Sequence, residues 1–184
     1  MMPSGIRFLP QSPPGDSSLP EGAFEYASKG GVKMINSSLI YIKKDGKYLM
    51  LHRVKKKNDM NHDKWIGIGG KFEHGESPED CVRRETTEET GLVLGKVEYR
   101  GIITFVLGDE TEYMHLFTSS DFSGQMKEVC DEGNPEWVDI KEVYNLPIWE
   151  GDKIFLKLIE SDETPFFSLK LVYENDVLVE HILY

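Results

Sequence analysis

Three glutamates and an arginine stand close together in the segment GGKFEHGESPEDCVRRETTEETGL, residues 69–92. In a helix, Glu85, Glu88 and Glu89 fall on one face, within about 100° of one another, and Arg84 lies beside them. Like charges at this spacing repel by roughly a few tenths of a kcal/mol for each pair. A bound divalent cation would make the arrangement favourable, because Mg²⁺ prefers oxygen ligands. The segment therefore predicts a helix that binds a metal ion.

The ends of this helix are marked in the sequence. Ser77 is a good N-cap, Pro78 suits the first helical position, and Asp80 occupies the capping-box position. Gly91 is a natural stop. We therefore expect a helix from Pro78 to about Thr90.

The charged residues and glycines of the segment also follow a longer pattern. They are Gly70, Glu76, Arg84, Glu85, Glu88, Glu89 and Gly91, followed by an apolar Leu92. This spacing resembles the box of the Nudix hydrolases, G-x5-E-x7-R-E-U-x-E-E-x-G-U, in which U is a bulky apolar residue. Thr86 departs from the box, since it replaces an apolar residue, and we expect it to cost some core contact without loss of function.

The resemblance implies hydrolysis of a nucleoside diphosphate linked to another group, with Mg²⁺ as cofactor and Mn²⁺ as a substitute. Arg84 is expected to orient Glu76 or Glu85 by charge-assisted hydrogen bonds. Gly69 lets the backbone approach closely, so its carbonyl is a further candidate ligand. The candidate metal ligands are thus Gly69, Glu76, Glu85, Glu88, Glu89 and Glu132.

Two residues are candidates for the general base that activates water. One is Glu85 in the box. The other is Glu132 in CDEGNPEW, because MutT-like Nudix enzymes often place a glutamate on a loop just before such a strand; alternatively, Glu132 is an exposed loop acid. Arg53 and Lys71 are candidates for contact with phosphate oxygens, or are ordinary surface charges.

A weaker resemblance concerns the substrate. The segment NPEWVDIKEVYNLPIWEGD, residues 134–152, resembles the part of 8-oxo-dGTP diphosphatases that closes over the purine. It implies that Trp149 stacks on the base and that Asp152 forms a hydrogen bond with its edge. The alternatives are a core tryptophan and a helix cap.

Ile66 departs from some purine-sanitising enzymes, which have an asparagine at this position. Isoleucine cannot form the hydrogen bonds of an asparagine, so another polar side chain would have to contact the base. The candidates on the first strand are Asn36, Ser37 and Ser38.

The remaining pattern predicts the elements that must hold these residues. Hairpins are expected around Asp45-Gly46, Gly108-Asp109 and Glu174-Asn175, and a second helix within WEGDKIFLKLIES, residues 149–161. Strands mixed with two separated helices indicate an α/β or α+β fold, a mixed sheet between helices. We expect a flexible arm over residues 1–31 and one Nudix domain over 32–184, with its box at 70–92.

The composition and charge of the chain limit the partners and the cellular setting that we expect for the protein. The net charge of -11 argues against binding a nucleic acid polymer, but a metal ion can bridge acidic protein to a nucleotide. No apolar run approaches the roughly 20 residues of a membrane span, and the N-terminus has no targeting pattern. Two distant cysteines indicate a reducing, cytoplasmic setting. The C-terminal hairpin offers an edge that can pair two copies in a homodimer, unless its apolar residues pack on their own core.

The leading hypothesis is a pyrophosphohydrolase of oxidised or ordinary purine nucleoside triphosphates such as 8-oxo-dGTP. A second hypothesis keeps the chemistry but takes another nucleoside diphosphate conjugate, such as ADP-ribose. A third is a nucleotide-sensing domain that binds without cleaving. Such a domain is expected to have lost carboxylates of the box, and this chain keeps all of them.

Overall fold

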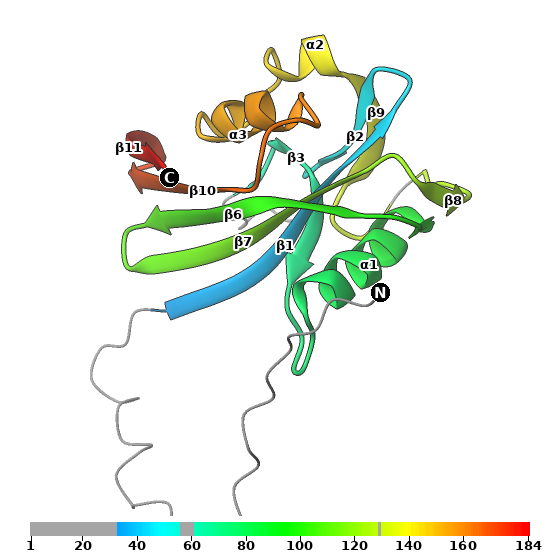
Figure 1. Cartoon of the computed structure of the whole chain (residues 1–184), viewed down its shortest axis with the longest axis horizontal. Coiled ribbons are helices and arrows are strands. Elements are labelled where there is room, and N and C mark those ends of the chain that lie inside the picture. The colour runs from blue at the N-terminus through cyan, green and yellow to red at the C-terminus, as the bar shows by residue number, and fades with distance from the viewer. Residues whose placement is uncertain (1–32, 56–60, 129) are drawn as a thin grey trace, which may run out of the picture. The chain divides into compact units, whose positions relative to one another are not determined.

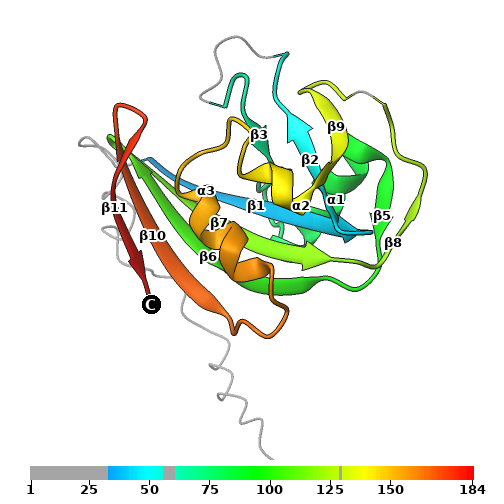
Figure 2. The same cartoon turned by 90° about the horizontal axis from the view of Figure 1, so that it is seen from above.

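A mixed sheet with helices on both faces forms the frame of the protein (Figures 1 and 2). The computed structural model describes residues 33–55, 61–128 and 130–184. The strands are β1 (Lys33–Lys44), β2 (Lys47–His52), β3 (Trp65–Ile66), β4 (Ile68–Lys71), β5 (Leu92–Leu94), β6 (Glu98–Leu107), β7 (Glu110–Ser119), β8 (Phe122–Gly124), β9 (Asn134–Asp139), β10 (Phe167–Glu174) and β11 (Val177–Leu183). The helices are α1 (Pro78–Thr90), α2 (Ile140–Val143) and α3 (Asp152–Ile159).

The main sheet has nine strands, in the order β11-β10-β6-β7-β1-β2-β3, with β4 paired to β1 and β9 paired to β2. The β1–β7 and β6–β10 pairs are parallel, and the other pairs are antiparallel. Strands β5 and β8 form a separate two-stranded sheet. The predicted mixed sheet is therefore confirmed, and its two parallel pairs bring segments far apart in sequence side by side.

Each face of the sheet packs against a different helix layer, because side chains alternate along a strand. Ile40 and Ile42 of β1 belong to a core cluster with Val82 of α1. Tyr41, between them, belongs to a second cluster with Phe155 of α3. Figure 1 shows α1 on one side of the strands and α2 with α3 on the other. The predicted placement of the sheet between helices is confirmed.

Helix α1 begins and ends where the sequence predicts. The Ser77 hydroxyl accepts a hydrogen bond from the Asp80 N–H at 3.2 Å, and the Asp80 carboxylate accepts one from the Ser77 N–H at 3.1 Å. Gly91 ends the helix in the left-handed region, with φ of 75°. Thr86 is fully buried, and its hydroxyl donates to the Val82 carbonyl at 2.7 Å. The departure from the box is thus accommodated with its polar group satisfied.

The three expected hairpins are present, joining β1 to β2, β6 to β7 and β10 to β11. The last turn is shifted by one residue: Glu174 pairs with Val177, so Asn175 and Asp176 form the turn, both with positive φ. Within the described residues, no helix is long and apolar enough to cross a membrane. The predicted arm over 1–31 lies outside the described residues, whereas the described residues between Lys33 and Tyr184 belong to one compact unit.

Candidate active site

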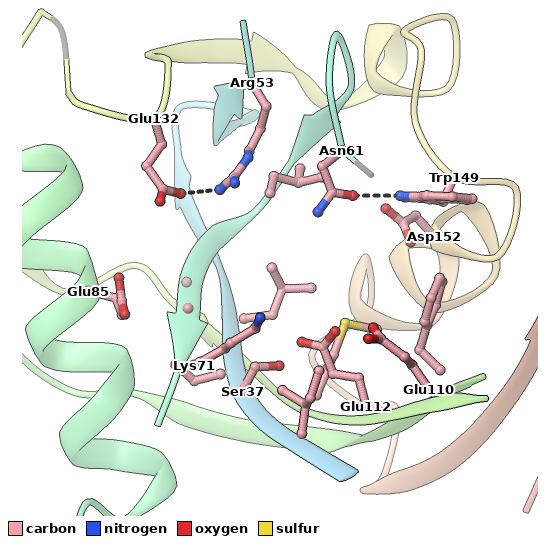
Figure 3. A pocket seen from close by; sticks show the side chains of 18 of the residues that line it. Ser37, Arg53, Asn61, Lys71, Glu85, Glu110, Glu112, Glu132, Trp149 and Asp152 are labelled. Carbon is pink, nitrogen blue, oxygen red and sulfur yellow. Dashed lines mark hydrogen bonds and ion pairs between the residues drawn. The ribbon is translucent and has the colours of Figure 1, made fainter. Parts of the chain in front are cut away.

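A cavity of about 610 Å³ lies on the face of the sheet that α3 covers, and it extends as far as α1. Glu85 of α1 lines one end, and Trp149 and Asp152 line the other (Figure 3). The structure thus brings the two regions that the sequence separated, the box and the candidate base-binding residues, to opposite ends of one cavity.

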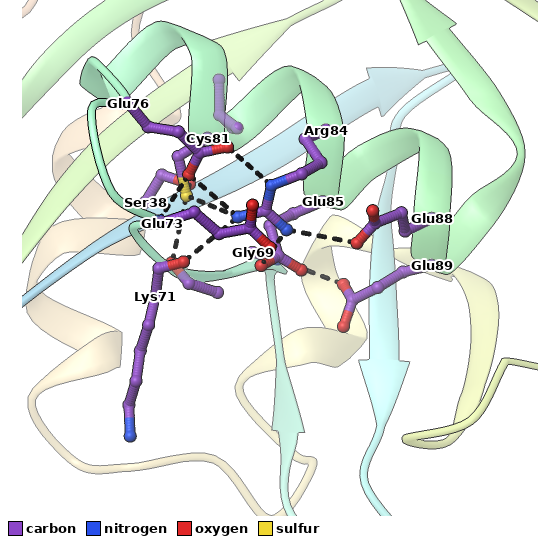
Figure 4. Close-up of polar contacts among 12 residues, drawn as sticks. Ser38, Gly69, Lys71, Glu73, Glu76, Cys81, Arg84, Glu85, Glu88 and Glu89 are labelled. Carbon is purple, nitrogen blue, oxygen red and sulfur yellow. Dashed lines mark hydrogen bonds and ion pairs between the residues drawn. The ribbon is translucent and has the colours of Figure 1, made fainter.

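Arg84 connects the carboxylates at the α1 end (Figure 4). Its Nε and Nη2 atoms donate to the two oxygens of Glu76 at 2.6 and 3.0 Å. Its Nη1 atom donates to Glu85 at 2.8 Å and to Glu88 at 3.1 Å. The hydrogen bonds from Arg84, aided by the Glu73 N–H, hold the pKa of Glu76 at about 2. Arg84 therefore orients both of the carboxylates that the sequence proposed for it.

Glu89 is the most deeply buried carboxylate of the box, with 5% of its surface exposed. Its Oε2 accepts a hydrogen bond from the Gly69 N–H at 3.2 Å, while its Oε1 is buried without a partner in the described part of the chain. Burial, and then the negative charges of Glu132 and Glu85, raise its pKa to about 8. Burial also raises the pKa of Glu85, which Arg84 opposes.

These carboxylates fit a divalent cation chemically, because an orphaned buried carboxylate oxygen with acidic neighbours is stabilised by a positive charge. Within residues 33–55, 61–128 and 130–184, no three Asp, Glu, His or Cys side chains are close enough together to hold a metal ion. Arg84 lies among the box carboxylates instead. Converging on a cation would therefore require their side chains to move.

Two glycines of β4 let the strand approach its neighbours closely. A Cβ at Gly70 would lie 2.2 Å from Oε1 of Glu85, and a Cβ at Gly69 would lie 2.0 Å from the Ser38 carbonyl oxygen. Both contacts are far shorter than any packing distance allows. Gly69 and Gly70 are therefore needed to place β4 against α1 and β1; the Gly69 carbonyl as a metal ligand stays a prediction.

Glu132 lies two residues before β9 and forms an ion pair with Arg53, just after β2 (Figure 3). Both side chains line the cavity, and only 27% of the Glu132 side chain is exposed, so it is not the exposed loop acid of the alternative interpretation. Lys71, at the end of β4, also lines the cavity. The two predicted phosphate contacts therefore lie in the same cavity as the box.

Trp149 is both a core residue and a cavity residue. With 5% of its surface exposed, it packs edge-on against Phe105 and Tyr173, at centroid distances of 5.6 and 5.0 Å. Its Nε1 donates to the Asn61 amide oxygen at 2.8 Å. Its ring still lines the cavity. The core interpretation and the base-binding interpretation are therefore compatible.

Asp152 lines the same end of the cavity with 6% of its surface exposed. Gly151, not Asp152, is the N-cap of α3, and within the described part of the chain no side-chain hydrogen bond caps that helix, so the helix-cap interpretation is wrong. Burial raises the pKa of Asp152 to about 8, opposed by the positive charge of Lys64. Asp152 is therefore a buried carboxyl group that faces the cavity without capping a helix, and such a group is a candidate for contact with a ligand.

The polar residues of β1 do not all line the cavity. Ser37 and Ser38 both line the cavity, and the Ser38 hydroxyl donates to the Cys81 sulfur of α1 at 3.1 Å. Asn36 is exposed and is not among the lining residues, so the structure does not bring it to the cavity. Ile66 does line it.

Four polar lining residues were missed from the sequence: Asn61, Glu73, Glu110 and Glu112. Asn61 lies in the polar, basic loop of residues 55–64, in which no residue stands out from the sequence as a candidate for binding. Glu110, Glu112 and Met114 occupy every second position of β7 and so share one face of the strand. The signal that could have found the two glutamates is their spacing of two residues at the start of a predicted strand.

The NUDIX domain model matches residues 33–159 of the chain, which therefore belongs to the Nudix family. The protein is a hydrolase of the group that acts on small nucleotide substrates and uses divalent metal ions.

Similar proteins agree with this assignment. The chain is 35% identical to an oxidized purine nucleoside triphosphate hydrolase of Danio rerio over 130 residues, 70% of this chain and 82% of that protein. It is 30% identical to one of Mus musculus, over 56% of this chain and 67% of that protein. A MutT protein of Bacillus halodurans has a crystal structure similar to this one, with a TM-score of 0.72 at 27% identity, covering 81% of this chain and 97% of that chain.

Proposed function

We propose that this protein is a Mg²⁺-dependent pyrophosphohydrolase of purine nucleoside triphosphates, with oxidised purines such as 8-oxo-dGTP as preferred substrates. Water adds to phosphorus and a phosphoanhydride bond breaks, which releases the nucleoside monophosphate and pyrophosphate. The observation that supports this most directly is the single cavity with the box at one end and Trp149 with Asp152 at the other. The names of the two vertebrate relatives point to the same substrate class.

The phosphate chain belongs at the α1 end. Glu85, Glu88 and Glu89 would hold Mg²⁺, with Glu76, Glu132 and the Gly69 carbonyl as further candidates; Mn²⁺ has the same ligand preference and is the expected substitute. When bound, the ion withdraws charge from phosphate and lowers the pKa of water.

The remaining steps fall to the chain's own side chains. Arg84 fixes the orientation of Glu85 and Glu76, which in-line attack requires. Arg53 and Lys71 line the cavity and are the candidates for contact with phosphate oxygens. Glu85 and Glu132 are both candidates to take the proton from water, and each lines the cavity.

The base belongs at the α3 end. Stacking on an aromatic ring is worth about 1–3 kcal/mol and is tolerant of base identity, so selectivity must come from hydrogen bonds. Asp152 is the buried carboxyl group placed to form one. Asn61, whose amide oxygen accepts from Trp149, lines the same end and presents a further polar side chain.

The test is product analysis of wild-type protein and Glu89→Gln with 8-oxo-dGTP, dGTP and ADP-ribose, each with and without Mg²⁺. We expect Mg²⁺-dependent release of monophosphate and pyrophosphate from 8-oxo-dGTP, and loss of turnover in Glu89→Gln with an unchanged circular dichroism spectrum. Glu79→Gln, an exposed pair partner of Arg83 on the same helix, is the matched control and should keep activity. Full activity of Glu89→Gln, or cleavage of ADP-ribose alone, would overturn the proposal.

Two further proposals concern the setting of the protein. We propose a reducing, cytoplasmic location, consistent with Cys81 and Cys130 being buried free thiols. The edge strand β11 exposes Val177, Val179 and Leu183, and we propose that it can pair two copies. Measuring the molar mass of the protein in solution tests the second proposal.

A further inference from the structure

Glu112 interrupts an apolar row that crosses the sheet. It is opposite Phe105 of β6 on one side and opposite Ile35 of β1 on the other. Phe105 in turn is opposite Leu171 of β10. Residues in register on neighbouring strands share a face, so the row consists of Leu171, Phe105, Glu112 and Ile35. Glu112 is its polar member, half-buried, and it lines the cavity.

A carboxylate beside apolar side chains is unfavourable unless something satisfies it. Within the described residues, no hydrogen bond or ion pair engages the Glu112 side chain. Methionine, which occurs two residues further along β7 on the same face, would fill the position without this cost. The placement of Glu112 therefore indicates a ligand that donates a hydrogen bond to it.

Asp152 is a second acceptor aimed into the cavity. It is more than nine-tenths buried, and its carboxyl group likewise has no hydrogen bond within residues 33–55, 61–128 and 130–184. Figure 3 shows Asp152 beside Trp149 and Glu112 on the opposite side of the cavity. The two groups come from α3 and β7, so a planar base that enters between them meets a carboxyl group at each edge.

We propose that Glu112 is a specificity-determining residue that accepts a hydrogen bond from N7–H of an oxidised purine, while Asp152 holds the opposite edge. This rests on the proposed function. Guanine offers donors at N1 and at its 2-amino group, but its N7 and O6 are both acceptors. Oxidation at C8 turns N7 into an N–H donor. A carboxylate facing N7 therefore attracts the oxidised base and repels the lone pair of the unoxidised one.

A carboxylate at this position would discriminate strongly between 8-oxo-dGTP and dGTP. A site built to accept a hydrogen bond rejects an analogue that lacks the donor, because the buried acceptor is left unpaired. Glu112 would therefore mainly weaken the binding of dGTP. This effect on specificity would be separate from the affinity that Asp152 and Trp149 contribute for both nucleotides.

Glu112→Gln tests the inference, since the amide can donate to the N7 lone pair of guanine. We expect kcat/KM to rise for dGTP and to fall for 8-oxo-dGTP, so that the preference for 8-oxo-dGTP falls at least about tenfold. A third nucleotide, 7-deaza-dGTP, has neither donor nor lone pair at this position. Wild-type protein should cleave it better than dGTP, and Glu112→Gln should reverse that order.

Glu136→Gln, an exposed strand carboxylate outside the cavity, is the matched control and should keep the wild-type preference. Glu112→Met gives a second variant that suits the apolar row. It should lose the preference, and dGTP cleavage should rise less than in Glu112→Gln, because methionine removes the repulsion but donates no hydrogen bond to N7. An unchanged preference in both Glu112 variants would overturn the inference while leaving the proposed function intact. Failure of wild-type protein to cleave either triphosphate with Mg²⁺ would overturn both.

Discussion

Arg84 and Glu76 are joined by two parallel hydrogen bonds, from Nε to Oε1 at 2.6 Å and from Nη2 to Oε2 at 3.0 Å. Bidentate pairing of this kind fixes direction as well as charge. The third nitrogen of the same guanidinium donates to Glu85 and Glu88. One side chain therefore sets the positions of three carboxylates, and the orientation of Glu85 depends on how Glu76 holds Arg84.

Arg84→Lys should keep the positive charge but lose the planar guanidinium that donates two parallel hydrogen bonds to Glu76. A single ammonium cannot donate to both Glu76 oxygens and also reach Glu85 in the same geometry. We expect kcat with Mg²⁺ to fall about 10–100-fold, the range typical when a group that orients metal ligands is replaced. The apparent affinity for nucleotide, measured by equilibrium binding, should change much less. Arg83→Lys, whose guanidinium contacts Glu79 on the outer side of α1, serves as control, and equal kcat in the two variants would contradict the role of Arg84.

Gly70→Ala should disable the site through one added methyl group. The new Cβ would lie 2.2 Å from Oε1 of Glu85, so the Glu85 side chain must move away from β4. We expect turnover of 8-oxo-dGTP to fall at least about tenfold, because displacement of a catalytic group by about 1 Å can cost 100-fold. Steady-state kinetics and a melting curve are the measurements.

Gly46→Ala is the matched control for this change. Gly46 has a φ of 74° but open space where a Cβ would stand, so alanine there costs roughly 1–2 kcal/mol of backbone strain without touching the site. The control should lose stability and keep turnover. If Gly70→Ala also keeps turnover, the close approach of β4 to Glu85 is not needed for activity.

The local parts of this fold were predictable because their signals are local. The bounds of α1 follow from Ser77, Pro78 and Gly91, whose caps and backbone preferences act within a few residues. The hairpins follow from short turns for the same reason. In contrast, the parallel β1–β7 and β6–β10 pairs join strands separated by many residues, and no turn marks them.

The site divides in the same way. The box is one continuous segment, so its carboxylates could be named in advance. Glu112 becomes a site residue only because β7 pairs with β1 and β6, and its role depends on that register. Asn36 shows the converse: it is exposed on β1 and does not line the cavity, although the next two residues, Ser37 and Ser38, do.

Trp149 should affect binding more than chemistry. Trp149→Ala removes the ring and should raise KM for 8-oxo-dGTP about 5–150-fold, corresponding to a stacking contribution of about 1–3 kcal/mol. Trp149→Phe keeps a ring but loses the hydrogen bond to Asn61, and it should raise KM much less. The alanine variant also removes a core contact and should destabilise the fold by about 3–5 kcal/mol. Kinetics should therefore be measured where circular dichroism shows each variant folded.

Phe155→Leu separates stability from binding in this comparison. Phe155 is fully buried in the same core cluster but does not line the cavity, so its truncation should lower the melting temperature with little effect on KM. A rise in KM for Phe155→Leu as large as that for Trp149→Ala would mean that the loss of stability, and not the missing ring, explains the effect.

Asp152 should make the protein less stable as pH rises. Its pKa is about 8 in the folded state, because burial disfavours the charged form, and near 3.9 in an unfolded chain. Between these values the folded state binds more protons than the unfolded state, so the free energy of unfolding falls with rising pH and levels off above about pH 8. Asp152→Asn cannot titrate, so its free energy of unfolding should fall less over the same range, by on the order of 4 kcal/mol between about pH 5 and about pH 9.

Urea denaturation at about pH 5 and about pH 9, with EDTA present, measures this difference. Glu89, whose pKa is also about 8, gives a slope of the same sign, so the informative quantity is the difference between wild type and variant. Asp109→Asn, at an exposed turn position, should reproduce the wild-type pH dependence. If Asp152→Asn does so as well, then Asp152 is ionised in the folded protein at neutral pH, and the carboxyl group at this end of the cavity meets the base as a charged acceptor.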